Sequence, residues 1–402
     1  MDPPPLFDPA RHEALRAIEW NPAAVQAAVR RIADDALEHL DRRSGLWTTH
    51  PADEPEPPDA RYAMLYFGAG GVLWALERLQ REAGITHGLD IAALLQALIE
   101  RQRETLRAWG AGDGSYLMGE SGLRLLQWSL TNDDAAAARL YALVETNLDH
   151  PSREALWGAP GSLLAALPMA EAGAGDAWAA LFARGVERLW QQMEHDATLG
   201  VWLWRQDLDG KHVTYLGAGH GFAGNVYPFL RGAALLPAER VAALAERALA
   251  TLQATALHDD AGGANWHAYI HPPPTGRLPL VQDCHGAPGI VMRCARAPRN
   301  PAWDTLLTAA GELTWRAGPL AKGAGLCHGT AGNGYALLAL HQRTGDARWL
   351  ERARAFAMHA LEQVDAARAA HGQGRHSLWT GDVGVALYAL DCIGGRFAFP
   401  TL

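Results

Sequence analysis

The chain has 402 residues, of which 49% are hydrophobic and 20% are charged, and its formal net charge is −9. Its lysines and arginines form no basic cluster, which argues against a nucleic acid partner, and its apolar content is too high for a disordered chain. The sequence contains no run of about 18 apolar residues and no secretory signal, so we expect no membrane span and a cytoplasmic location.

Seven stretches of the chain have the apolar spacing of amphipathic helices. In chain order they cover residues 22–43, 91–109, 133–149, 176–194, 237–257, 301–317 and 346–368. Several begin with proline or aspartate, which helix N-termini favour. Strand signals are sparse and are confined to short pieces within residues 201–215.

Between these stretches the sequence repeats a Gly-x-x-Gly motif that is followed by an apolar run. The motifs begin at Gly68, Gly119, Gly158, Gly221, Gly286, Gly329 and Gly381. A single motif of this kind is weak, but seven at roughly regular spacing indicate a structural repeat. We predict an all-α protein with the fold of an α/α toroid, a double ring of seven apolar inner helices and seven amphipathic outer helices. We expect one domain over residues 1–402, with residues 1–16 as a flexible N-terminal segment.

Two of the seven motifs follow a cysteine and a histidine. Cys284 and His285 precede Gly286, and Cys327 and His328 precede Gly329. Equivalent positions in neighbouring hairpins should bring both thiols to the same rim of the ring. Thiolate and imidazole suit tetrahedral Zn²⁺, and three protein ligands leave one position open for catalysis. The sequence predicts a site of both cysteines and one histidine, and it does not choose between His285 and His328.

The other two cysteines, Cys294 and Cys392, lack this pattern, and we expect them to be small buried apolar residues. Four cysteines in a chain of this length do not form a disulfide framework.

A proton donor is suggested by His220, which directly precedes the motif at Gly221. A histidine at the mouth of a metal site can donate or accept a proton near neutral pH, whereas a core histidine would only bond a backbone carbonyl. Glu154 lies four residues before Gly158 and can reach the same rim, although exposed glutamates are also common. The long segment at 257–279 precedes the first Cys-His pair, and we expect it to influence substrate choice.

The motifs resemble those of the lanthionine synthetase C-like family over nearly the whole chain. The sharpest matches are Gly217-Ala218-Gly219-His220-Gly221, Cys284-His285-Gly286-Ala287-Pro288-Gly289 and Gly325-Leu326-Cys327-His328-Gly329. The resemblance implies an α/α toroid in which Cys284, Cys327 and His328 hold zinc and His220 acts as acid or base. At position 154 the eukaryotic-type branch has glutamate, as here, whereas the peptide-cyclising bacterial members commonly have aspartate.

The resemblance also implies substrate contacts. Lys322 and Arg277 are similar to basic residues of the eukaryotic-type branch that are associated with glutathione or phosphopeptide substrates. Asp283 departs from the family pattern, which usually has tryptophan before the first zinc cysteine. A carboxylate beside the metal site would alter the basicity of the thiolates or the fit of the substrate.

The resulting hypothesis is a zinc-dependent enzyme that adds a thiol to dehydroalanine or dehydrobutyrine. The thiol is glutathione or a peptide cysteine, and the partner is a peptide or protein that carries dehydroamino acids or phosphorylated Ser/Thr. His220 would protonate the enolate. Alternatives are a lantibiotic-type peptide cyclase, a zinc and glutathione binding protein without turnover, and a toroid glycosidase that pairs Glu154 with Asp283 or Asp382.

Overall fold

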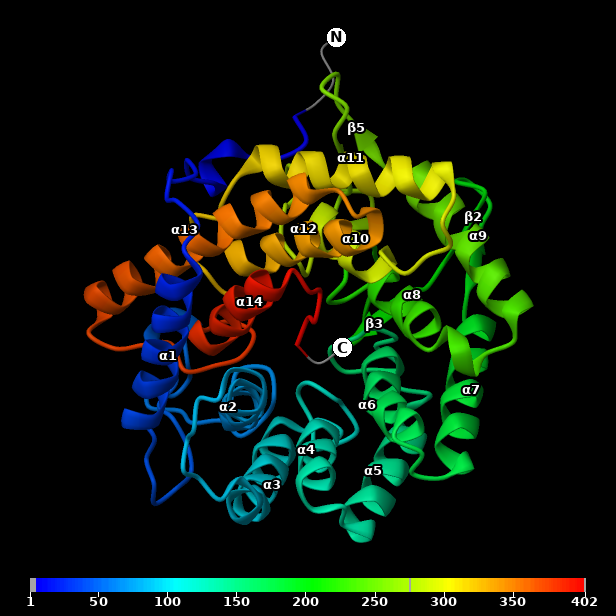
Figure 1. Ribbon diagram of the computed structural model, residues 1–402. Coiled ribbons are helices and arrows are strands. Elements are labelled where there is room, and N and C mark those ends of the chain that lie inside the picture. The colour runs from blue at the N-terminus through cyan, green and yellow to red at the C-terminus, as the bar shows by residue number, and fades with distance from the viewer. Residues whose placement is uncertain (1–4, 275, 401–402) are drawn as a thin grey trace.

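The computed structural model describes residues 5–274 and 276–400, and the α-helices within them form two concentric layers (Figure 1). The outer helices are α1 (Pro22–Glu38), α3 (Ile91–Trp109), α5 (Asp134–Asn147), α7 (Asp176–Gln191), α9 (Ala238–Thr255), α11 (Pro301–Ala317) and α13 (Ala347–His371). The inner helices are α2 (Ala69–Ala83), α4 (Ser121–Thr131), α6 (Ala159–Glu171), α8 (Phe222–Arg231), α10 (Ala287–Cys294), α12 (Thr330–Thr344) and α14 (Asp382–Gly394). The predicted all-α toroid is confirmed.

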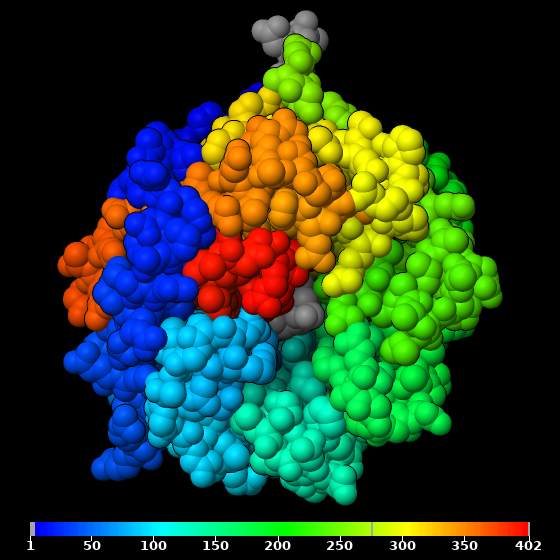
Figure 2. All heavy atoms as spheres, in the orientation of Figure 1, coloured from blue at the N-terminus to red at the C-terminus, as the bar shows by residue number. Residues whose placement is uncertain are grey.

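The inner helices close into a ring. Each one contacts the next along the chain, and α14 contacts both α2 and α1, so the last repeat meets the first. In Figure 2 the red C-terminal sector accordingly lies beside the blue and cyan N-terminal sectors. Helix α12 is buried along nearly its whole length, whereas the outer helices bury one face, as an amphipathic pattern requires.

The second glycine of each motif lies in the first turn of an inner helix, where it packs against its own preceding loop. A Cβ on Gly332 would lie 1.8 Å from the carbonyl oxygen of Leu326, and one on Gly289 would lie 1.9 Å from that of Asp283. Because no side chain fits there, the loop folds back tightly over the helix start. The repeat therefore encodes seven similar loops at one rim of the ring.

The outer helices begin close to where the sequence predicts. Asn21, Asp90, Asp133, Asn300 and Asp346 cap five of them, each accepting a backbone N–H in the first turn. The ends differ more: the first helix stops at Glu38 rather than at residue 43, and α13 continues to His371.

Short strands lie in the connections between α7 and α10 along the chain. They are β1 (Glu194–Asp196), β2 (Val201–Leu203), β3 (Gln206–Leu208), β4 (Lys211–Tyr215), β5 (Leu257–His258), β6 (Ala264–Asn265) and β7 (Tyr269–His271). The strands expected within 201–215 are present, and β3 and β4 form a hairpin whose two-residue turn, Asp209-Gly210, has positive φ at both positions. The segment at 257–279 holds three further strands, of which β7 pairs with β4.

The described part of the N-terminal segment, which the sequence predicts to be flexible, packs onto the ring. Leu6 is buried, and its carbonyl oxygen accepts a hydrogen bond from Asn265 (2.8 Å). The Glu13 carboxylate lies 2.7 Å from Nε2 of the buried His359. These contacts join the segment to two different parts of the ring. Residues 1–4 lie outside the described part.

The segment after α14 runs into the middle of the ring (Figure 1). Phe399 is buried there, with its ring centroid 4.9 Å from that of Tyr335 and 5.3 Å from that of Trp379. The chain end thus helps to fill the interior. Within the described residues, no helix is long and apolar enough to cross a membrane.

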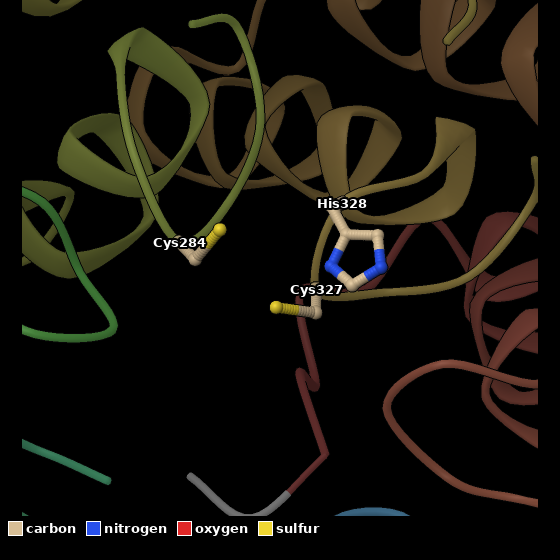
Figure 3. Close-up of side chains that lie close together, drawn as sticks. All are labelled: Cys284, Cys327 and His328. Carbon is tan, nitrogen blue, oxygen red and sulfur yellow. The ribbon is translucent and has the colours of Figure 1, made fainter. Parts of the chain in front are cut away.

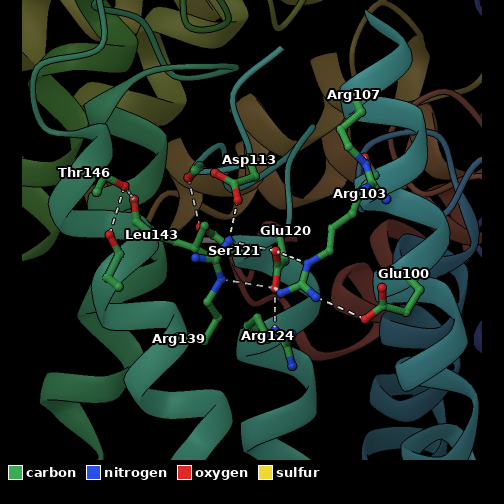
Figure 4. A network of polar contacts seen from close by, with 12 residues as sticks. Glu100, Arg103, Arg107, Asp113, Glu120, Ser121, Arg124, Arg139, Leu143 and Thr146 are labelled. Atoms are coloured by element: carbon green, nitrogen blue, oxygen red, sulfur yellow. Dashed lines mark hydrogen bonds and ion pairs between the residues drawn. The ribbon is translucent and has the colours of Figure 1, made fainter. Parts of the chain in front are cut away.

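A buried carboxylate ties three helices together (Figure 4). Glu120 is fully buried at the start of α4 and receives Arg103 of α3 (2.9 Å), Arg124 of α4 (2.7 Å) and Arg139 of α5 (3.1 Å). Burial alone would raise the pKa of Glu120, but the hydrogen bonds from these arginines lower it below its usual range. The ionised carboxylate therefore stabilises the fold.

We expect Glu120→Ala to lower the free energy of unfolding by about 3 kcal/mol, because it leaves the mostly buried Arg124 without its carboxylate. Glu100→Ala is the matched control, since Glu100 is half exposed and contributes at most about 0.5 kcal/mol. Because the folded pKa of Glu120 is depressed, its contribution is present above the unfolded pKa and is lost as the pH falls through the folded pKa. Denaturant titrations should show that the free energies of unfolding of the wild type and Glu120→Ala converge in acid. Equal free energies of unfolding for these two proteins at neutral pH would contradict the account.

Candidate metal centre and proton donor

Two cysteines and one histidine converge at the rim where the glycine loops meet. Cys284, Cys327 and His328 each offer a ligand atom, and these atoms lie within 4.8 Å of one another. Both sulfurs and the imidazole face a common space (Figure 3). None of the four cysteines is in a disulfide. The cluster has the composition and spacing to hold a metal ion.

A chain of backbone hydrogen bonds between loops positions these residues. The Gly219 N–H donates to the carbonyl of Cys284, and the Cys284 N–H donates to that of Cys327 (both 3.2 Å). The Cys327 N–H donates to the carbonyl of Trp379 (2.9 Å), and the Trp379 N–H to that of Tyr66 (3.0 Å). Loops from five different repeats are thereby linked side by side, which sets the separation of the two sulfurs.

The local chemistry suits a cation. The adjacent thiol of Cys284 and burial raise the pKa of the Cys327 thiol well above its usual value. The Cys284 sulfur accepts a hydrogen bond from the side-chain amide of Gln282 (3.0 Å). Two neighbouring thiolates repel each other unless a positive charge lies between them, and two sulfurs with one imidazole are a donor set that zinc prefers.

The structure resolves which histidine accompanies the cysteines. His328 belongs to the cluster, whereas His285 does not. The His285 ring lies against Tyr215 (5.5 Å between centroids) and His220 (6.0 Å). Burial and the neighbouring His220 lower the pKa of His285 to about 4, so it is neutral at physiological pH.

The partly exposed His220 pairs with the buried Glu154 beside the cluster. Nδ1 of His220 lies 2.9 Å from Oε2 of Glu154, which is fully buried. The carboxylate also accepts the backbone N–H groups of Leu156 (2.9 Å) and Trp157 (2.6 Å). Burial lowers the pKa of His220, but the hydrogen bond and charge of Glu154 outweigh it, so the pKa is raised. With Nδ1 held by Glu154, Nε2 is left to exchange a proton with a substrate.

Asp283, the residue that departs from the family pattern, is buried and paired with Arg293 of α10. Two contacts of 3.2 and 3.3 Å join the carboxylate to the guanidinium. The Arg293 guanidinium lies over the ring of Phe399 (5.0 Å), so the C-terminal segment supports the same pair. Burial raises the pKa of Asp283, and the charge and hydrogen bond of Arg293 oppose that rise.

A pocket beside the cluster is lined by one equivalent residue from every repeat. The residue two positions before each first glycine of the motif reaches it; these residues are Tyr66, Leu117, Leu156, Gly219, Cys284, Cys327 and Trp379. His220 also lines the pocket. Sequence reasoning missed Tyr66 and Trp379, whose rings stack on each other (5.5 Å) beside the thiols. Their position in the repeat was the signal that could have found them.

Lys322 and Arg277 are not brought into this pocket. Both are exposed, and neither lines the space next to the cysteines. Lys322 lies on the loop that leads to Cys327, and Arg277 lies between β7 and Cys284. Their predicted role in substrate binding stays a prediction.

Residues 59–401 match the family described as lanthionine synthetase C-like protein. Glutathione S-transferase LANCL1 of Danio rerio is 30% identical over 43% of this chain and 40% of its own length. LanC-like protein GCL1 of Arabidopsis thaliana is 42% identical over 21% of this chain and 22% of its own. The alignments thus span less than half of either relative.

Among solved structures, nisin cyclase has the same fold, with a TM-score of 0.63 and 14% identity over 90% of this chain and 93% of that one. The family match covers most of the chain and includes every residue of the metal cluster. This chain belongs to the lanthionine synthetase C-like family.

Proposed function

We propose that this protein is a zinc-dependent enzyme that forms thioether bonds by adding a thiol to dehydroalanine or dehydrobutyrine residues. The observation that carries the proposal is the convergence of Cys284, Cys327 and His328 next to the His220–Glu154 pair. A soft metal site and a proton donor at one pocket are what this addition requires.

Cys284, Cys327 and His328 would hold zinc, whose positive charge would favour the thiolate form of the incoming thiol, and the thiol proton would pass to the solvent. The sulfur then forms a bond to the β-carbon of the acceptor, and the electron pair of the C=C bond moves toward the carbonyl. Protonated His220 delivers the proton from Nε2 to the α-carbon, which completes the addition. Glu154 stabilises the imidazolium before transfer and keeps Nδ1 protonated throughout.

Glutathione is the thiol that we favour over a cysteine of the same peptide. Support comes from the matched relative named glutathione S-transferase and from Glu154, which is shared with the eukaryotic-type branch. We place Lys322 and Arg277 outside the pocket, where their exposed charges would bind a carboxylate of the thiol or a phosphate of the peptide.

The glycosidase alternative is disfavoured by the carboxylates themselves. It needs two carboxyl groups that face a sugar. Glu154 accepts two backbone N–H groups and pairs with His220, Asp283 is paired with Arg293, and the partly buried Asp382 accepts the backbone N–H of Arg375 (2.9 Å). Each of these carboxyl groups is thus already engaged within the protein.

Mass spectrometry tests the proposal. The zinc-loaded protein is incubated with a dehydrobutyrine peptide and glutathione, and the peptide should gain the mass of one glutathione. A second peptide, which carries both dehydrobutyrine and a cysteine, is incubated without glutathione. If the enzyme cyclises this peptide, the cysteine thiol should no longer react with an alkylating reagent. No adduct and no ring formation by protein with stoichiometric zinc would overturn catalysis and favour a binding protein.

A further inference from the structure

A groove begins at His220 and runs outward across the same rim. One wall is the loop after α3, from Trp109 to Gly112, and the other is the β3–β4 turn at 207–210. The groove has a volume of about 670 Å³, which is within the usual range for ligand sites. His220 lines both this groove and the pocket beside the cysteines, so the two spaces adjoin at this side chain.

An exposed indole forms part of the groove. The Trp109 side chain is 45% exposed, the highest value among the large apolar residues that the structure describes. The Tyr62 ring supports it from behind (5.8 Å between centroids), and the half-buried Trp157 also lines the groove. Tryptophan in a concave surface is a typical anchor for an apolar side chain of a partner.

Glycines leave room along both walls of the groove. A Cβ on Gly110, Gly112 or Gly210 would meet nothing within 4 Å. The N–H groups of Gly110 and Gly210 already donate to Arg107 and Asp207, so an extended peptide would bind these walls mainly by placing alternate side chains against its anchors.

The charge of the groove is acidic. Its lining residues include Asp207 and Asp209 but no lysine or arginine. Asp207 already accepts the N–H of Gly210 (2.8 Å), whereas Asp209 is exposed at the turn and has no ion-pair partner within the described residues. A basic side chain of a partner would find an uncompensated carboxylate here.

We propose that this groove binds the acceptor peptide in an extended conformation, with an apolar side chain on Trp109 and a lysine or arginine at Asp209. The proposal rests on the proposed function for the identity of the reacting residue, which would lie at His220. It assigns a sequence preference to the enzyme: an acceptor residue flanked by an apolar and a basic residue.

Binding is measured first, with an unreactive peptide that has alanine at the acceptor position, by isothermal titration calorimetry. Trp109→Ala should weaken binding about tenfold or more, as the loss of an aromatic anchor does. Asp209→Lys should reverse the preference between otherwise identical peptides with lysine or glutamate at the flanking position. Leu199→Ala, which removes another exposed apolar side chain away from the groove, is the control and should bind as the wild type does.

Turnover gives the second measurement. The ratio of kcat/KM for the peptide to kcat/KM for N-acetyldehydroalanine methylamide, which is too small to reach Trp109, should fall in Trp109→Ala. If Trp109→Ala and Asp209→Lys bind the peptide as the wild type does and adducts still form, the groove is not the peptide site, whereas the proposed thioether chemistry stands. If the variants bind the peptide more weakly but the wild type forms no adduct with either acceptor, the groove is the peptide site and the proposed chemistry is wrong.

Discussion

Replacing Cys284 or Cys327 by alanine is expected to remove bound zinc and thioether formation together. Each variant leaves only two protein ligands, so we expect the affinity for zinc to fall by at least about 100-fold. The loss of a hydrogen bond that only supports a ligand has a smaller effect on metal affinity. Metal analysis after gel filtration should find about one zinc per wild-type chain and almost none in the variants. The same preparations should form no glutathione adduct above the uncatalysed rate.

Cys294→Ala is the matched control for these variants. Cys294 is a fully buried cysteine at the end of α10 and lies outside the cluster, so its replacement should retain zinc and activity. Zinc at wild-type stoichiometry in Cys284→Ala and Cys327→Ala would contradict the assignment of the ligands.

The second large effect is expected at His220. His220→Asn removes the proton donor, and we expect kcat to fall by about 10²–10⁴-fold while zinc content stays unchanged. Single-turnover assays with pre-loaded zinc measure this directly. A variant that retains kcat would show that the proton comes from elsewhere.

Glu154→Gln tests whether Glu154 sets the pKa of His220, the residue that we propose transfers the proton. Glu154 raises the pKa of His220, so a rate that needs the protonated imidazole falls as the pH rises through that pKa. Without the carboxylate the pKa of His220 decreases, and the fall in rate should move to lower pH. Identical pH profiles of kcat in the two proteins would exclude this role for Glu154.

The sequence predicts the ring and the two cysteines of the candidate metal site because both are encoded locally, but it does not choose between His285 and His328. Glycine pairs mark the start of each inner helix, and capping residues such as Asp90 and Asn300 mark outer ones. The two Cys-His-Gly segments occupy the same position in adjacent repeats, which is why the toroid brings their thiols together.

Contacts between distant parts of the chain could not be predicted in this way. No local pattern indicates that Glu154 bonds His220, that Asp283 pairs with Arg293, or that Phe399 packs into the ring. The position of the N-terminal segment likewise depends on Asn265, which lies in a loop of a different repeat. Such pairings become visible only once the ring has closed and its seven loops lie side by side.

The most direct test of the account is X-ray absorption at the zinc edge of the purified protein, without and with glutathione. The account predicts two sulfur ligands at about 2.3 Å and one imidazole nitrogen at about 2.0–2.1 Å, with a third sulfur added when glutathione is present. A spectrum without sulfur ligands, or one that glutathione leaves unchanged, would contradict it.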